Sequence, residues 1–570
     1  MYFHPFNYCF LSRTCGMKLT NQFMNILYKT SVLLWCIILF FGELYAQDYS
    51  NNARVSERIN SLVKTYPSLI SAKSLTKTLG GKDIWMLSIG IGNTGQKPAI
   101  AIVGGVEGSH LLGTELALGF AEKILKDSAL DSIKAILERN TFYIFPNMSP
   151  DATEQYFAQI RYARSGNAKA TDDDRDGKLN EDGFDDLNKD GKISWIRVED
   201  PTGMYRINPE EPRSMILADP SKGESGKYLL FSEGIDNDKD GNYNEDAEGG
   251  VHFNKNMSYD YPNFVPGSGE HMVSEIENRV LLDNLFEMFN VHSVITFGPY
   301  NNLSVPVAFN AQAISKRIIT GYFEADAKAN ALVSELYNKT LGLKDAPKST
   351  SDGGDFAQWA YFHYGRHSFS SPGWWVPKAK ADTLKKVKEL KIEDPSANYL
   401  RWADSQGLKN NFTEWKQIEH PDFPGQKVEL GGIDPFVLKN PPFKLVEELV
   451  KKHSDFILAL SKYTPSIDIT NIKKEKLGKD LTRVTVSLLN KGILPTQTKI
   501  GERSYWVKKL IVKIIPEANQ TIISGRKNQT IDAIQGQGNQ SLSWLIKGSG
   551  KLTINAGSPT SGTKTVEVSL

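Results

Sequence analysis

Strand-length apolar runs alternate with amphipathic helical segments through most of this 570-residue chain. The strand-like runs lie at residues 85–92, 98–106 and 140–148, and helical periodicity occurs at 52–64 and 115–126. A helical segment at 274–289 is followed by another strand-like run. Strands that alternate with helices predict an α/β domain built on a mostly parallel central sheet. This alternation constrains the fold more than any other feature of the sequence.

The pattern changes near residue 464. An amphipathic helix is predicted over 443–462, and it ends at Thr464-Pro465. From Ser466 onward, short segments alternate like strands and are separated by Gly, Asn and Pro turns. This stretch has about the length of a β-sandwich. We therefore expect an α/β domain at 47–463 and a C-terminal β-sandwich domain at 464–570.

The N-terminus has the features of a secretory signal. Residues 31–41 form an apolar run that Lys18 and Lys29 precede and the small residue Ala46 follows. The run is shorter than the roughly 20 residues of a membrane span. The sequence predicts a signal peptide at 1–46, a secreted or periplasmic protein, and no stable membrane span after signal removal; an uncleaved anchor remains the alternative.

Composition narrows the function classes. Hydrophobic residues make up 40% and charged residues 23%, as in ordinary soluble proteins. The 67 basic and 66 acidic residues give a net charge of +1, which disfavours nucleic acid as a partner. All three cysteines lie in the predicted leader, so the mature protein is expected to contain no disulfide.

Three acidic loops share one pattern within an insertion at about 165–248. Oxygen-bearing side chains alternate along each loop and a glycine takes the sixth place, which is how a loop wraps Ca²⁺. No helix clearly flanks each loop, so they do not form an EF-hand pair, and a solvated acidic insertion with Asx-turns is the alternative. The predicted calcium ligands are Asp172, Asp174, Asp176 and Asp182; Asp186, Asn188 and Asp190; and Asp236, Asp238, Asp240 and Asp246. The prediction is stronger for the first and third loops than for the second.

Six segments, read in order, resemble the zinc carboxypeptidase family of carboxypeptidase A type. They are GGVEGSHLLGTELALGFA, FPNMSPDA, GVHFNKNMSYDYP, SEIENRVLLDNL, ITFGPYNNLSVP and GDFAQWAYFHYGRHSFSSPGWW. The resemblance covers roughly residues 50–460. It implies an α/β/α domain with a mixed, mostly parallel sheet, and hydrolysis that removes C-terminal residues from peptides. It also implies zinc held by His, Glu and His, with a glutamate that takes a proton from the bound water.

Carried over residue by residue, this zinc site is altered. Glu107 stands at the first histidine position and His110 at the glutamate position, so the two candidate zinc ligands are interchanged. The third zinc position falls on Gly298, and His292 lies six residues earlier in the same predicted strand. The position of the catalytic glutamate falls on Ser371, Pro372 or Gly373, so no catalytic residue is matched.

The residues that recognise the substrate's carboxylate match the family better. Asn254 stands at the family's asparagine position and Lys255 at its arginine position, where a lysine keeps the charge without the bidentate fork. Arg161 or Arg164 is the candidate for the arginine that supports the oxyanion. Surface charge is the alternative for these basic residues, and aromatic packing is the more favoured reading of His363 and His367.

Three hypotheses of function follow. The first is a degenerate family member, exported and stabilised by calcium, that binds peptide or protein C-termini. The second is an active metallocarboxypeptidase with a rearranged zinc site that uses Glu107, His110 and a further ligand. The third is an adhesion or scaffold protein in which the acidic loops and the β-sandwich carry the role. Losing both the general base and a zinc ligand favours the first hypothesis.

Overall fold

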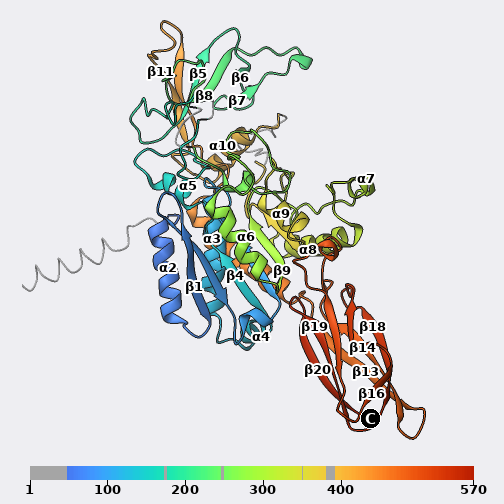
Figure 1. Cartoon of the computed structure of the whole chain (residues 1–570). Coiled ribbons are helices and arrows are strands. Elements are labelled where there is room, and N and C mark those ends of the chain that lie inside the picture. Colours follow the sequence, from blue (N-terminus) through green and yellow to red (C-terminus); the bar gives the residue numbers. More distant parts are fainter. Residues whose placement is uncertain (1–47, 173–175, 245–248, 350, 380–391) are drawn as a thin grey trace, which may run out of the picture. The chain divides into compact units, whose positions relative to one another are not determined.

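A six-stranded mixed sheet forms the centre of the α/β region (Figure 1). The computed structural model describes residues 48–172, 176–244, 249–349, 351–379 and 392–570, so the predicted signal peptide lies outside the described residues. The strands, in sheet order, are β1 (Ile70–Lys77), β2 (Asp83–Ile89), β4 (Thr141–Phe145), β3 (Ala99–Val103), β9 (Val291–Phe297) and β10 (His367–Ser371). Strands β4, β3, β9 and β10 run parallel, and β1 and β2 pair antiparallel. The predicted α/β fold with a mixed sheet is confirmed.

Helices cover both faces of this sheet. The helices of the chain are α2 (Asn52–Thr65), α3 (Leu111–Lys126), α4 (Asp131–Arg139), α5 (Pro150–Glu154), α6 (Ile276–Glu287), α7 (Ala311–Ser315), α8 (Glu324–Leu341), α9 (Phe356–Phe362), α10 (Pro395–Ser405) and α11 (Val446–Ser461). Ile100 and Ile102 of β3 pack in one core with α2, α3, α8 and α11. Ala101 and Val103 pack in a second core with α6 and α9. Successive side chains of a strand point to opposite faces, so an entirely apolar strand serves two helical layers.

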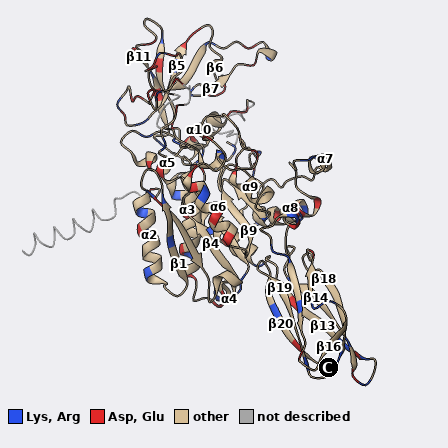
Figure 2. Ribbon diagram, in the orientation of Figure 1, with Lys and Arg blue, Asp and Glu red and all other residues tan. Residues whose placement is uncertain are grey.

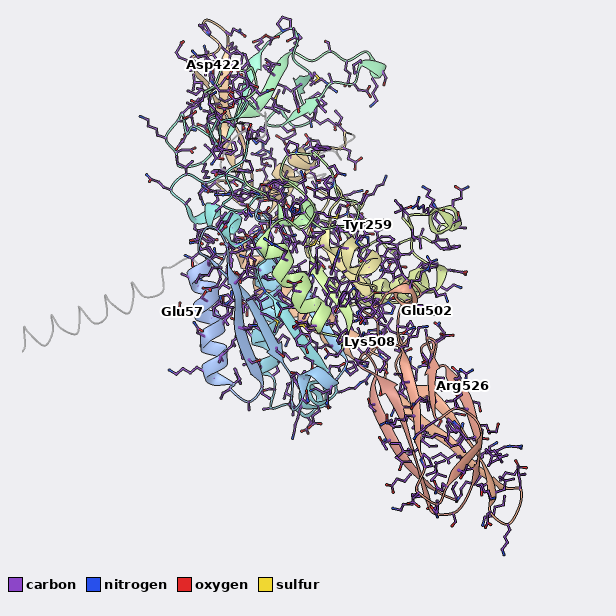
Figure 3. All side chains as sticks on the ribbon, viewed as in Figure 1. Glu57, Tyr259, Asp422, Glu502, Lys508 and Arg526 are labelled. Carbon is purple, nitrogen blue, oxygen red and sulfur yellow. The ribbon has the colours of Figure 1, made fainter. Side chains whose placement is uncertain are left out.

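A second six-stranded sheet is entirely antiparallel and was not predicted from the sequence. Its order is β11 (Phe412–Ile418), β12 (Val428–Ile433), β5 (Trp195–Glu199), β8 (Tyr228–Ser232), β6 (Tyr205–Ile207) and β7 (Met215–Leu217). The acidic insertion contributes β5 to β8, and a segment about 200 residues later contributes the other two strands. Asp422, in the turn between β11 and β12, accepts a hydrogen bond from the Asp236 N–H at 3.1 Å (Figure 3).

The C-terminal segment forms two four-stranded antiparallel sheets. One has the order β13 (Ile467–Lys476), β14 (Leu481–Asn490), β18 (Asn539–Lys547), β16 (Thr521–Ser524), and the other β17 (Asn528–Ile531), β15 (Leu510–Ile515), β19 (Lys551–Ser558), β20 (Gly562–Ser569). Side chains from both sheets, such as Val486 and Ile554, share one apolar cluster. Additional antiparallel sheets at the C-terminus are therefore confirmed.

The surface carries both signs of charge. Acidic and basic residues are interspersed along the ribbon (Figure 2). In the described part of the chain, no helix is both long and apolar enough to cross a membrane.

The loop after β3 approaches α5 so closely that Gly108 has no room for a side chain. A Cβ atom at Gly108 would lie 2.1 Å from the Cβ of Ala152 and 2.9 Å from the carbonyl oxygen of Arg164. We expect Gly108→Ala to lower the free energy of unfolding by about 1–3 kcal/mol, the usual cost of overpacking. Gly95→Ala is the matched control, because its nearest neighbour would be 3.6 Å away. Denaturant unfolding measures both, and equal stabilities would contradict the packing described here.

Candidate functional site

The candidate site lies where the parallel strands end. The carboxyl ends of β3, β4, β9 and β10 meet at one edge of the sheet, which is where open α/β folds bind ligands. The loop after β3 carries Glu107 and His110, and His110 is the residue directly before α3. The Gly298 N–H donates to the Ser371 carbonyl at 3.1 Å. The structure thus brings together the segments that were expected to hold zinc and the catalytic glutamate.

His110 is buried and joins two of these segments. Its Nε2 lies 3.0 Å from the Pro372 carbonyl oxygen, which accepts, so Nε2 carries the proton in this contact. Burial, followed by the charge of Lys439, lowers the pKa of His110 to about 4, so the ring is neutral at pH 7. Its Nδ1 has no hydrogen-bond partner, and a Cβ on Gly113 would lie 3.3 Å from it. The free nitrogen therefore faces the first turn of α3.

The charges of two lysines, Lys439 and Lys255, act on Glu107. Burial raises the pKa of this carboxyl group, and the charges of Lys439 and Lys255 and a hydrogen bond from Asn254 act in the opposite direction. The Lys439 ammonium donates to the Ser109 Oγ at 2.9 Å, two residues from Glu107. The Lys255 ammonium lies 3.5 Å from the Pro266 carbonyl oxygen. Sequence reasoning missed Lys439, because nothing in its local sequence marks it as part of the site.

Asn254 connects Glu107 to a second buried carboxyl group, that of Asp355. The Asn254 amide donates to Asp355 Oδ2 at 3.0 Å, and its oxygen accepts from the Phe356 N–H at 3.0 Å. Asp355 also caps α9 by accepting from the Gln358 N–H at 2.8 Å. Burial raises the pKa of Asp355 to about 6, and the nearby charge of Glu107 adds to this rise. An Asp just before a short helical pattern is a cap signal, and it could have drawn attention to Asp355.

Other residues join the rim of this site. His252, two residues before Asn254, has its pKa lowered to about 4 by burial and by the charges of Lys255 and Lys439. Tyr259, five residues after Asn254, stacks on Phe362 of α9 with ring centroids 4.1 Å apart (Figure 3). These contacts hold the Asn254 segment, whose short helix is η4 (Phe253–Lys255), against the start of α9.

The donors present do not fit zinc. Among the described residues, the one group of three or more His, Cys, Asp or Glu side chains close enough to share a metal is Asp236, Asp238 and Asp240, so no such set includes His110. At Gly298 a Cβ would lie 2.6 Å from Val106 Cγ2, so a side chain has no space there. Ser371 is one candidate for the position of the catalytic glutamate, and it carries a hydroxyl in place of a carboxylate. Its Oγ lies 2.8 Å from the Tyr337 hydroxyl.

Three other histidines from the sequence analysis make their contacts outside the loop after β3. His292 is at the beginning of β9, with Nδ1 2.8 Å from Ser293 Oγ and Nε2 2.9 Å from the Pro495 carbonyl oxygen. Its ring packs beside His367, with centroids 4.9 Å apart. His363 Nδ1 lies 2.9 Å from Ser258 Oγ. None of the three reaches the loop after β3, and the packing interpretation suits both His363 and His367.

The two arginines serve local structure. The Arg161 guanidinium lies over the Tyr156 ring, 5.6 Å from its centroid. Arg164 donates to the carbonyl oxygens of Gly166, at 3.2 Å, and Asn167, at 2.5 Å. The backbone of Arg164 is close to Gly108, so this arginine belongs to the wall of the site more clearly than Arg161 does.

The three acidic loops have the same backbone geometry. In each, the glycine at the sixth place has a positive φ and donates its N–H to the first aspartate: Gly177 to Asp172 at 3.1 Å, Gly191 to Asp186 at 2.9 Å, and Gly241 to Asp236 at 3.0 Å. Positive φ is what glycine provides at low cost in such a turn.

The first and third loops differ from the second in one respect. In Asp172 and Asp236 the other carboxylate oxygen, Oδ1, is buried and has no hydrogen-bond partner. In Asp186 the corresponding oxygen accepts from the Asp190 N–H at 3.1 Å, and that N–H also lies 2.8 Å from Asn188 Oδ1. The predicted ligands Asp174 and Asp246 lie outside the described residues. Calcium binding, with the first and third loops before the second, stays a prediction.

Asp182 differs from the other predicted calcium ligands because its carboxylate already accepts backbone hydrogen bonds from the third loop. It is fully buried and accepts from the Asn237 N–H at 3.0 Å and from the Asn244 N–H, which ties the first loop to the third. Asp176 pairs with Lys178 at 2.5 Å. Asp238 and Asp240 lie with Asp236 in the group that could share one cation.

Comparison with known proteins identifies two regions. The family model for zinc carboxypeptidase matches residues 55–223, and a model described as "Domain of unknown function (DUF8731)" matches residues 466–569. Carboxypeptidase D of Mus musculus is 26% identical over 139 residues, which cover 24% of this chain and 10% of that protein. Carboxypeptidase D of Anas platyrhynchos is 29% identical over 141 residues, again 24% and 10%. The chain thus spans about a tenth of the length of these relatives.

Matches among solved structures have low TM-scores and low identity. Thrombin activatable fibrinolysis inhibitor matches with a TM-score of 0.36 and 10% identity over 74% of this chain and 75% of that chain. Carboxypeptidase A from Helicoverpa armigera matches with a TM-score of 0.34 and 12% identity over 63% and 71%. The family match covers the segment that holds β3, Glu107 and His110. The predicted resemblance to the zinc carboxypeptidase family is therefore confirmed for residues 55–223.

Proposed function

We propose that this protein is an exported, catalytically degenerate member of its family that binds peptide or protein C-termini without zinc-dependent hydrolysis. The observation that carries the proposal is the incomplete ligand set: among the described residues no metal-sharing group includes His110, and the third ligand position is Gly298, where a Cβ would lie 2.6 Å from Val106 Cγ2. Hydrolysis by the family mechanism needs three protein ligands and a general base. The active enzyme with a rearranged site remains the second candidate function.

Binding of a terminal carboxylate rests on the two lysines. Lys255 and Lys439 place two positive charges beside one half-buried carboxyl group, Glu107, whose own pKa they lower. Asn254 directs its amide to Asp355, so it positions the segment more than it contacts a ligand. A peptide carboxylate would add a second negative charge between the lysines. Lysine binds such a group as a point charge.

Replacing Lys255 tests this proposal. We expect Lys255→Met to weaken binding of a peptide with a free C-terminus by roughly 10–100-fold, because hydrogen bonds to charged groups contribute about 1.5–3 kcal/mol. Fluorescence polarisation with a labelled peptide library measures the affinity. Lys473→Met, at an exposed position in β13, is the control for loss of charge alone.

An amidated peptide separates the hypotheses further. Weak binding of the C-terminal amide by the unaltered protein supports carboxylate recognition, and mass spectrometry should find the bound peptide intact. Equal binding of acid and amide would contradict the proposal, and release of a C-terminal residue would support the rearranged enzyme. Binding of immobilised glycans in place of peptides would favour the adhesion hypothesis.

We also propose that the first and third acidic loops bind Ca²⁺. The buried, unpartnered oxygens of Asp172 and Asp236 support this, because a carboxylate oxygen without a donor is costly to bury unless a cation neutralises it. Calcium bound there would hold the insertion that supplies β5 to β8. Calcium binding and the predicted export support each other, because calcium is abundant outside the cell.

Substitution of Asp236 tests the calcium proposal. Calcium at 100 times its dissociation constant should raise the free energy of unfolding by about 2.7 kcal/mol. Asp236→Asn keeps an acceptor for the Gly241 N–H and should lose most of this gain, whereas Asp283→Asn, at an exposed position in α6, should keep it. Calorimetry with calcium and with chelator measures the difference; no response of the unaltered protein would refute calcium binding.

The two C-terminal sheets, which share one apolar cluster, support a β-sandwich domain at 464–570. We propose that it serves for packing or attachment, because the described residues of its strands include no group of metal-ligating side chains.

A further inference from the structure

A small cavity at the start of α6 collects polar atoms that lack partners. It has a volume of about 10 Å³, enough for one water-sized occupant, and its lining includes Ser149, Glu277 and Asn278. Both carboxylate oxygens of Glu277, the Oδ1 of Asn278 and the Oγ of Ser149 have no hydrogen-bond partner. These side chains are 3%, 0% and 6% exposed. Buried polar atoms are almost always satisfied, so four orphans around one cavity indicate an occupant.

The orientation of Asn278 is fixed. Its amide nitrogen donates to the Phe253 carbonyl at 2.9 Å, so its oxygen is the atom without a partner. The occupant must therefore satisfy at least two acceptors, an amide oxygen and a carboxylate, and it meets a Ser149 hydroxyl that can accept or donate. Such hard oxygen ligands suit a cation of the alkali or alkaline-earth series.

The neighbouring charged groups are already paired. Asp151 accepts from Thr78 Oγ1 at 2.6 Å and from the N–H groups of Gly80 and Ala168, each at 3.2 Å.

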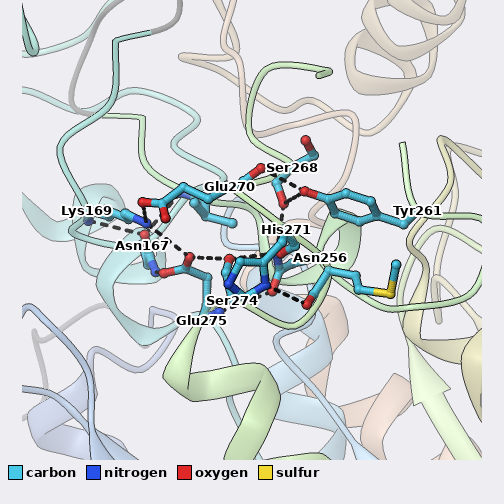
Figure 4. A network of polar contacts seen from close by, with 12 residues as sticks. Asn167, Lys169, Asn256, Tyr261, Ser268, Glu270, His271, Ser274 and Glu275 are labelled. Atoms are coloured by element: carbon cyan, nitrogen blue, oxygen red, sulfur yellow. Dashed lines mark hydrogen bonds and ion pairs between the residues drawn. The ribbon is translucent and has the colours of Figure 1, made fainter. Parts of the chain in front are cut away.

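Glu275 accepts from Ser274 and from Asn167, at 2.6 and 2.9 Å, and lies 3.5 Å from the Lys169 ammonium (Figure 4). Among the described residues, neither carboxylate oxygen of Glu277 has a hydrogen-bond partner.

We propose that this cavity binds a monovalent cation of sodium size, held by Glu277, Asn278 and Ser149. One carboxylate with two neutral oxygens balances a single positive charge, whereas calcium sites in proteins use six to eight oxygens and usually several carboxylates. The site is separate from the acidic loops and from the two lysines beside Glu107.

The cavity also touches the candidate site. Val251 and Phe253 line it, and they directly precede Asn254. A cation there would hold the start of α6 against the segment that carries Asn254 and Lys255. The role of the cation would therefore be to position the segment that carries Asn254 and Lys255.

Calorimetry of the full mature protein tests the proposal at pH 8. Sodium chloride is compared with choline chloride at equal ionic strength, with calcium held at a fixed saturating concentration. We expect the melting temperature to rise with sodium but not with choline, and Glu277→Gln to abolish the difference. Glu287→Gln, at an exposed position in the last turn of the same helix, should respond like the unaltered protein.

Three results would overturn the proposal. The first is an equal melting temperature in both salts, which indicates a water beside a neutral Glu277. The second is an unchanged response to sodium in Glu277→Gln. The third is stabilisation by calcium alone. Anomalous diffraction from crystals of the unaltered protein soaked in thallium(I) tests the site without any substitution. A peak between Glu277 and Asn278 supports the site, and an empty cavity refutes it.

Discussion

The hydrogen bond from His110 to the Pro372 carbonyl determines how the candidate site is built. It joins the loop after β3 to the loop after β10, across the edge of the sheet where parallel strands end. This bond keeps the imidazole proton on Nε2 and turns Nδ1 towards α3. The bond fastens the two loops to each other and fixes the orientation of the imidazole ring between them. The arrangement of Glu107, Asn254 and Asp355 follows around this fixed point.

Buried charge is an organising feature of the site. Glu107 and Asp355 are carboxyl groups with raised pKa values, and Asn254 lies between them. Lys255 and Lys439 supply the positive charge in their surroundings. A site with fixed lysines and no ligand set for zinc is better suited to holding an anion than to polarising a peptide carbonyl. The proposed cation would bind in the cavity that Phe253 lines, and it would anchor the segment that carries Lys255.

The sequence was sufficient to predict the central sheet and the acidic loops for physical reasons. Entirely apolar strands such as 99–103 and the helical periodicity of α3 and α11 mark a sheet covered on both faces. The loops follow from local chemistry, since Gly177 and Gly241 must take positive φ to close onto Asp172 and Asp236. Such features depend on neighbours in sequence.

The second sheet and half of the site could not be predicted in this way. Strand β5 pairs with β12, more than 220 residues later, and strands as short as β6 and β7 have little periodicity. Asp355 and Lys439 reach Glu107 from distant parts of the chain, and an isolated Asp or Lys has no distinguishing pattern. The family resemblance located Glu107, His110 and Asn254, and the three-dimensional contacts were needed to show what surrounds them.

The most direct test of this account is elemental analysis by mass spectrometry of the mature protein after equilibration with trace zinc and calcium. The account predicts calcium and no zinc above background. One zinc per chain that His110→Ala removes would contradict it, because His110 would then belong to a zinc ligand set.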